Sequence, residues 1–290
     1  MSLQIHVLDL GDLHIESSFL VLARNSGTLV RIPTFGLLIL GGEAPLLVDT
    51  GYRSPEIMQR LNMVGIQSEE QHLENQLAKH GLGINDVRYV LHTHLHIDHA
   101  GQDDHFPMST TVIINRRELE YSVSGLMGEQ YPPEDMKHLI DRLHTPGALR
   151  LLDLELTGPE EIIPGVRCEA AGGHTEGSMN ILVETAEGTA CICGDVIYNV
   201  QYQVVEPFVE KLALEPAPTG NHGMNKREVK AAVKRALQFA FVLPAHDRPA
   251  KVEHGKVVGR LHDTVPGPVQ PLESVQEIVV GKDTDGDRLE

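Results

Sequence analysis

The residues best suited to chemistry lie in the segment VLHTHLHIDHAG, residues 90–101. Its core, His94-x-His96-x-Asp98-His99, places four metal ligands within six residues, directly after an apolar run. Imidazole and carboxylate are ligands of zinc and of harder divalent cations. On an extended strand end, His94 and His96 point to the same side, and a following turn would re-aim Asp98 and His99. The spacing predicts that one short segment serves two adjacent metal ions.

Three further candidate ligands follow expected strands elsewhere in the chain. His174 lies in a glycine-rich loop, Asp195 follows Gly194, and His246 follows Pro244-Ala245. The strands that precede them are expected at 166–170, 189–193 and 241–243. One isolated histidine or aspartate does not identify a metal site. Together with the first segment, however, these residues give a set of seven ligands.

Short β-prone runs with helices between them must position these residues. Further strands are expected at 5–10, 19–23, 35–40, 45–49, 87–93, 111–114, 149–154 and 180–184. Helix starts are expected at Ser54, Ser68, Asn115, Pro133 and Asn225. This alternation predicts one layered α/β domain over residues 1–263, with 264–290 as a partly flexible C-terminal extension. The segments 121–146 and 199–221 are expected to act as lids or binding loops.

Composition narrows the class of partner. The 290 residues are 41% hydrophobic and carry a formal net charge of −17, which disfavours nucleic acids and anionic membranes as partners. No apolar run is long enough to span a bilayer, and residues 1–12 lack the basic and apolar regions of a secretory signal. The three cysteines cannot form a disulfide framework, so we expect a cytoplasmic protein. Cys191 and Cys193 are expected to be small core residues.

The seven ligands taken together resemble those of the metallo-β-lactamase-fold hydrolases. The resemblance covers residues 35–246 and implies an αββα sandwich with a dinuclear metal site, usually zinc, with iron, manganese or cobalt as alternatives. It implies one metal on His94, His96 and His174, a second metal on Asp98, His99 and His246, and Asp195 as the bridge. Asp49, in the family's strand-turn motif, would orient a ligand histidine through its free ring nitrogen. The alternative for Asp49 is a simple turn residue before Gly51.

Three features discriminate between branches of this family. The β-lactamase branches lack a bridging aspartate, and the flavodiiron branch has a glutamate where His96 stands. Tyr198, three residues beyond Asp195, is similar in place to a tyrosine of the N-acyl homoserine lactonases that reaches the substrate carbonyl. Glu176 departs from that family, in which a proline is more common at this place.

The resemblance thus implies a metal-dependent hydrolase that opens a lactone ring by attack of a metal-bridging hydroxide. Tyr198 would stabilise the oxyanion, and Asp98 would carry the proton to the leaving oxygen. Hydrolysis of another ester, of a glyoxalase-type thioester or of a phosphotriester stays open, as do a mononuclear-iron sulfur dioxygenase and a protein with a structural metal. Similar lactonases suggest a homodimer. His92 is expected in the core, and His105, His222 and His254 in exposed loops.

Overall fold

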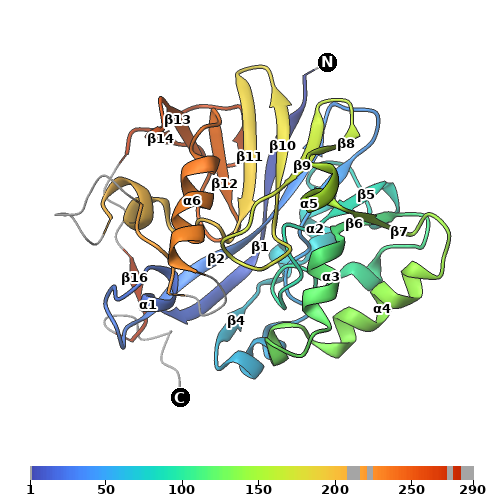
Figure 1. The fold of residues 1–290 in the computed structure, drawn as a ribbon, viewed down its shortest axis with the longest axis horizontal. Coiled ribbons are helices and arrows are strands. Elements are labelled where there is room, and N and C mark those ends of the chain that lie inside the picture. The colour runs from blue at the N-terminus through green and yellow to red at the C-terminus, as the bar shows by residue number, and fades with distance from the viewer. Residues whose placement is uncertain (1, 208–215, 221–224, 273–276, 282–290) are drawn as a thin grey trace.

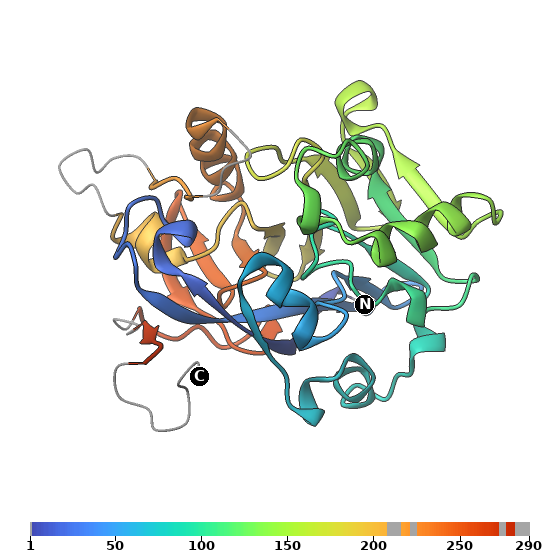
Figure 2. The ribbon, with the colours of Figure 1, turned by 90° about the horizontal axis from the view of Figure 1, so that it is seen from below.

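A computed structural model describes residues 2–207, 216–220, 225–272 and 277–281 of the chain. Two β-sheets pack face to face, with helices on both outer sides (Figure 1). Helix α6 lies on one side of the molecule, and helices α3 and α4 lie on the other (Figure 2). The predicted αββα sandwich is therefore confirmed.

The first sheet is built around a long hairpin of β1 and β2, drawn in blue in Figure 2. Strands β3, β5, β6 and β7 continue it as a parallel array. In order across the sheet, its strands are β15 (Thr264–Val265), β1 (Gln4–Glu16), β2 (Leu29–Leu40), β3 (Leu46–Val48), β5 (Tyr89–Leu91), β6 (Thr111–Asn115) and β7 (Leu149–Leu152). Strand β4 (Val64–Ile66) also pairs with β1, and β16 (Ile278–Val279) pairs with β2.

The second sheet has seven strands and one parallel pair, β11 with β12. In order, its strands are β14 (Lys256–Arg260), β13 (Ala250–Glu253), β12 (Phe241–Pro244), β11 (Gly188–Gly194), β10 (Met179–Thr185), β9 (Val166–Ala170) and β8 (Glu160–Ile163). Because β9 and β11 are both antiparallel to β10, strands β9, β11 and β12 run in one direction. Their carboxyl ends consequently meet at one edge of the sheet.

The helices are short. They are α1 (Ser17–Leu20), α2 (Leu73–Ala78), α3 (Arg116–Ser122), α4 (Pro133–Leu143), α5 (Leu154–Thr157) and α6 (Lys226–Ala236). The 3-10 helices are η1 (Pro55–Leu61), η2 (Glu69–Gln71), η3 (Ile84–Asp86), η4 (Asp103–His105) and η5 (Gly128–Gln130), and η6 (Gln201–Val205) is a π-helix. Among the described residues, no helix has the length and apolar character needed to cross a membrane.

Three apolar layers hold the sandwich together. The central layer joins both sheets, with Ile39 and Ile113 from the first and Ile181 and Phe241 from the second. A second layer lies between the first sheet and helices α2, α3 and α4. A third joins the second sheet to α6 and contains Cys191 and Cys193, which confirms the prediction that these cysteines are core residues.

Several sequence-based expectations need correction or refinement. The strand expected at residues 19–23 is wrong: the chain forms α1 and then a turn, in which Ala23 has a φ of 61°. Asn115 does not cap α3, because its side chain donates to Glu155 and to the Gly177 carbonyl instead. Asn225 does cap α6, accepting from Arg227 N at 2.8 Å.

The segments expected as loops or extensions contain regular structure. Residues 121–146 include η5 and α4, and residues 199–221 include η6, although 208–215 and 221 lie outside the described residues. In the segment 264–290, β15 pairs with β1 and β16 pairs with β2. The described parts of the C-terminal segment thus extend the first sheet.

Candidate metal centre

All seven predicted ligands meet at one end of the sandwich. The turn after β5 carries His94, His96, Asp98 and His99, and the loop after β9 carries His174. Asp195 follows β11 and His246 follows β12. The side chains fall into two groups, His94, His96, His174 and Asp195 in one and Asp98, His99 and His246 in the other. In each group the ligand atoms lie within 4.8 Å of one another.

Three imidazole nitrogens converge in the first cluster, which we define as His94, His96 and His174. His94 Nε2 lies 3.1 Å from His96 Nδ1, and His174 Nε2 lies 3.1 and 3.0 Å from these two atoms. Nitrogens bound to one tetrahedral zinc ion at 2.0–2.1 Å would be separated by about 3.3 Å. The three histidines therefore need only a small adjustment to share one cation.

The second cluster is Asp98, His99 and His246. Asp98 Oδ1 lies 3.7 Å from His99 Nε2, and Asp98 Oδ2 lies 3.4 Å from His246 Nε2. His246 Nδ1 donates to the carbonyl oxygen of Pro33 at 2.8 Å, which leaves Nε2 facing the cluster. At 12% exposure, Asp98 is the most accessible side chain of the second cluster.

Asp195 lies between the two clusters. Its Oδ2 atom is 3.8 Å from His94 Nε2 and 3.5 Å from His174 Nε2. Its Oδ1 atom is 3.3 Å from the Nε2 atoms of both His99 and His246. One carboxylate thus faces both groups of nitrogens, as a bridging ligand must.

Asp49 connects the site to the polypeptide behind it. It lies at the end of β3 with a φ of 59°. Its Oδ2 accepts from His99 Nδ1 at 3.0 Å and from Thr93 Oγ1 at 2.7 Å, and its Oδ1 accepts from Thr93 N at 2.9 Å. Thr93 Oγ1 also lies 3.1 Å from His94 Nδ1. The expected contact from Asp49 to a ligand histidine is present, and a second contact runs through Thr93.

His92 lies outside the metal site. It is fully buried, with Nε2 at 2.8 Å from both oxygens of Asp103 and Nδ1 at 3.4 Å from Asp49. His105 and His254 are exposed, and His222 lies outside the described residues. The placements of His92, His105 and His254 agree with the expectation that these three are not ligands, whereas the expectation for His222 stays a prediction.

The donor set fits a pair of divalent cations. His99 Nε2 and Asp195 Oδ1 are buried, and neither has a well-formed hydrogen bond among the described residues. Such groups are costly unless a partner, such as a cation, is present. Borderline cations accept this mixture of imidazole and carboxylate.

The electrostatics differ between the clusters. Burial and neighbouring histidines lower the pKa of His94 and His96, and burial lowers the pKa of His174 to about 4. Burial also acts on His99 and His246, but carboxylates outweigh it: the pKa of His99 is raised, and that of His246 rises to about 10. The first cluster thus presents neutral imidazoles, which is the form that binds a cation. In the second cluster the carboxylates attract positive charge, which a cation can supply.

A narrow pocket with a volume of about 30 Å³ opens onto both clusters. Its apolar wall comes mainly from Leu13, Ile15, Phe19, Ile32, Leu61 and Met63, and its polar groups include Gln130 and Tyr198. Among the described residues that line it, none is a lysine or an arginine. The Tyr198 ring stacks on His246 with centroids 5.5 Å apart and meets His174 edge-on at 5.7 Å. Tyr198 is therefore placed between the clusters and the pocket.

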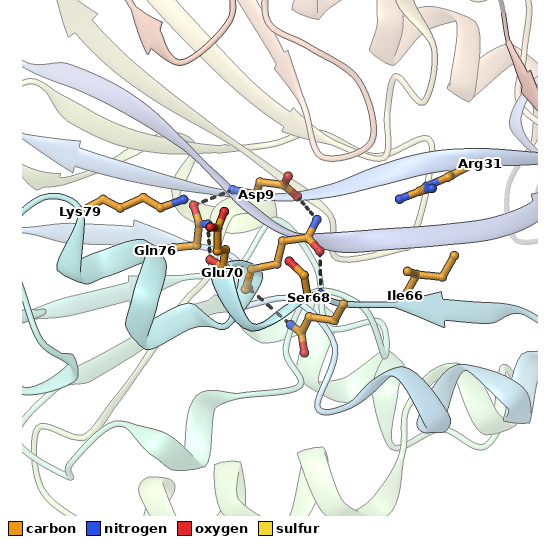
Figure 3. Close-up of a pocket in the computed structure, with 9 residues that line it drawn as sticks. Asp9, Arg31, Ile66, Ser68, Glu70, Gln76 and Lys79 are labelled. Carbon is orange, nitrogen blue, oxygen red and sulfur yellow. Dashed lines mark hydrogen bonds between the residues drawn. The ribbon is translucent and has the colours of Figure 1, made fainter. Parts of the chain in front are cut away.

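A wider pocket of about 430 Å³ lies away from the histidines, over β1, β4 and η2 (Figure 3). Its polar groups are largely engaged with one another: Asp9 accepts from Gln71 at 2.9 Å, and Asp9 N donates to Gln76 at 3.2 Å. Arg31 pairs with Asp12 at 2.7 Å. We regard this pocket as a solvated groove, because it contains no histidine and no group of ligands like those at the metal centre.

Sequence analysis missed Glu118, Tyr131 and Gln130. The Glu118 carboxylate is buried beside the first cluster, and the Tyr131 ring contacts His96 at 5.0 Å. The acidic residue in the first turn of α3 was visible, but that pattern is typical of exposed helix starts. Gln130 lines the pocket from a segment 30 residues beyond the histidines, and no spacing rule links the two.

Comparison with known proteins agrees with this geometry. The family model of the metallo-beta-lactamase superfamily matches residues 30–265. An N-acyl homoserine lactonase of Bacillus thuringiensis is 26% identical over 207 residues, which cover 68% of this chain and 76% of that protein. The N-acyl homoserine lactonase AiiB of Agrobacterium fabrum is 29% identical over 203 residues, covering 63% and 72%.

Two solved structures show the same fold. A probable metal-dependent hydrolase from Staphylococcus aureus has a TM-score of 0.68 at 18% identity, covering 90% of this chain and 97% of that one. A variant of B. thuringiensis AiiA with N-decanoyl-L-homoserine bound has a TM-score of 0.63 at 23% identity, covering 82% and 89%. The matched residues, the sandwich and the two His/Asp clusters show that this chain belongs to the metallo-beta-lactamase superfamily.

Proposed function

We propose that this protein is a metal-dependent hydrolase that opens the ring of an uncharged lactone, with N-acyl homoserine lactones as the candidate substrates. The pocket is the observation that carries the proposal, because it is largely apolar, opens onto both clusters and has no lysine or arginine among the described residues that line it. A neutral substrate with an apolar arm suits such a wall. A nucleic acid or a glutathione thioester would bring negative charges that find no partner there. The lactonase relatives support the same choice.

Seven residues would hold the metals. The first ion would lie on His94, His96 and His174, the second on Asp98, His99 and His246, with Asp195 shared between them. Two bound divalent ions, zinc by preference, supply a water of lowered pKa and a Lewis acid for the carbonyl group.

The remaining chemistry belongs to side chains of the chain. Tyr198 lines the pocket, so its hydroxyl donates to the carbonyl oxygen as negative charge develops there. Asp98 also lines the pocket. It takes the proton that the attacking water gives up and passes it to the ring oxygen as the bond between that oxygen and the carbonyl carbon breaks. The apolar wall keeps water other than the reactant away from the carbonyl group.

Substrate entry requires some rearrangement. A volume of about 30 Å³ is room for roughly one water molecule. Phe19, Leu61 and Met63 are partly exposed, and rotation of these side chains would widen the pocket. We therefore expect the apolar wall to adapt to the acyl arm.

The test is acid release from an N-acyl homoserine lactone in a pH-stat, with the protein as purified, stripped by chelator and restored with zinc. Release that disappears on stripping and returns with zinc supports the proposal. If no acid is released although two metals are bound, the lactone assignment fails. A parallel panel of an aryl ester, a thioester and a phosphotriester would then identify the class of substrate.

A further inference from the structure

Glu118 is a buried carboxylate that lies beside the first cluster without being one of its ligands. It is in the first turn of α3 and is 1% exposed. A carboxylate at this depth is costly unless donors surround it. None of the ion pairs among the described residues includes Glu118, so neutral donors must satisfy it.

The donors come from three separate segments. Glu118 Oε1 accepts from Leu95 N at 3.0 Å and from Tyr131 Oη at 2.9 Å. Its Oε2 accepts from Thr175 Oγ1 at 2.5 Å, and the Gly177 backbone also donates to the carboxylate. Every one of these groups is a donor, which matches a carboxylate and no other side chain of this length.

Three of the four donors adjoin a ligand of the first cluster in sequence or in space, and the fourth, Gly177, lies three residues after His174. Leu95 separates His94 from His96, and Thr175 follows His174. Tyr131 packs edge-on against His96, with ring centroids 5.0 Å apart. The second cluster has different supports, because Asp49 accepts from His99 and the Pro33 carbonyl accepts from His246.

We propose that Glu118 is a positioning residue that fixes the separation between the β5 turn and the β9 loop, and thereby assembles the first metal site. The inference rests on the proposed metal centre. The backbones of Glu118 and Gly177 are in close contact, since a Cβ added at Gly177 would lie 2.0 Å from Glu118 N. The β9 loop thus lies directly against α3, and the carboxylate joins it to the β5 turn.

Glu118→Gln is the decisive variant, because it keeps the size of the side chain and turns one acceptor into a donor that faces other donors. Metal-free protein is titrated with zinc against a chromophoric chelator, and two binding steps are resolved. Supporting contacts of this kind change metal affinity by about 10–100-fold. We expect the zinc affinity to fall by this factor in one binding step only. The affinity of the other binding step and the far-UV circular dichroism spectrum should be unchanged.

Glu120→Gln is the matched control, because Glu120 is exposed on the same helix. It should leave both steps at wild-type affinity. Thr175→Val removes one donor and should weaken the same step to a smaller extent, which tests the proposal even if Glu118→Gln folds poorly.

Two results would overturn the inference: wild-type affinity at both steps in Glu118→Gln, or an equal loss at both, which would indicate general structural damage. If the wild-type protein itself binds no metal, the proposed metal centre fails, and that outcome is distinct from either of these.

Discussion

Asparagine in place of Asp49 should weaken both metal-binding steps, and the second cluster more than the first. Asp49 accepts directly from His99 Nδ1 at 3.0 Å, whereas it reaches His94 only through the Thr93 hydroxyl. The side chains have the same size, and asparagine tolerates the φ of 59°, so backbone strain does not contribute. The effect should therefore come from the lost charge and the lost acceptor.

The magnitude follows from the type of hydrogen bond. Burial alone would raise the pKa of Asp49, but His99 and His92 outweigh it and lower the pKa to about 2, so the carboxylate is charged at neutral pH. A hydrogen bond to a charged group contributes about 1.5–3 kcal/mol. At 1.4 kcal/mol for each factor of ten, the second cluster should lose about 10–150-fold in affinity.

A companion variant isolates the indirect contact. Thr93→Val removes the hydroxyl and keeps the Thr93 backbone donor to Asp49 at 2.9 Å. A neutral hydrogen bond contributes about 0.5–1.5 kcal/mol, so the first cluster alone should lose about 2–12-fold. Asp12→Asn is the control, because Asp12 pairs with Arg31 away from the metal centre.

Competition titration with zinc measures both steps in all three variants. The reasoning is refuted if Asp49→Asn keeps wild-type affinity at both steps, since His99 would then need no partner. It is also refuted if Asp12→Asn causes the same loss, because the effect would then be one of net charge.

Three further outcomes are expected. Tyr198→Phe should lower kcat about 10²–10³-fold with both metals retained, as loss of one oxyanion donor does, and loss of metal instead would make Tyr198 a structural residue. Phe19→Ala should lower the KM of long-chain lactones by a larger factor than that of short-chain ones, because Phe19 narrows the pocket. Leu22→Ala, at a 41% exposed position, should change neither KM, and an equal fold-change in KM for both chain lengths in Phe19→Ala would contradict the reasoning. Burial raises the pKa of Asp135 to about 6, although Arg53 opposes the shift. The folded protein therefore keeps this proton up to about pH 6, whereas the unfolded chain loses it near pH 4. The free energy of unfolding consequently falls as the pH rises from about 4 to about 6. Asp135→Asn should therefore stabilise the protein at pH 8 by about 1–3 kcal/mol more than at pH 4, as measured by urea unfolding, and a gain that does not grow with pH would refute this.

The positions of the candidate ligands could be predicted because each lies in the turn or loop that follows a strand. A run such as Phe241–Leu243 has a recognisable apolar pattern, and the residue types after it, as at His246, are chemically distinctive. The same logic predicted the layered fold, since strands and helices alternate along the chain.

Residues whose role depends on distant contacts could not be found in this way. Glu118 sits where an exposed helix start would place it, and only the neighbouring Thr175 and Leu95 donors show its role. The apolar neighbours of Phe19 predict a strand, whereas the chain forms α1 there and places Phe19 in the pocket wall. Such outcomes are decided by tertiary packing, which overrides local preference.

The division of the candidate ligands between the two sheets has a consequence for biosynthesis. The turn after β5 belongs to the first sheet, whereas His174, Asp195 and His246 all follow strands of the second. When residues 94–99 leave the ribosome, His246 still lies 147 positions further along the chain than His99. A nascent chain therefore exposes the four candidate ligands of residues 94–99 without the other three until the second sheet packs against the first. Tight metal capture must be among the last steps of its maturation.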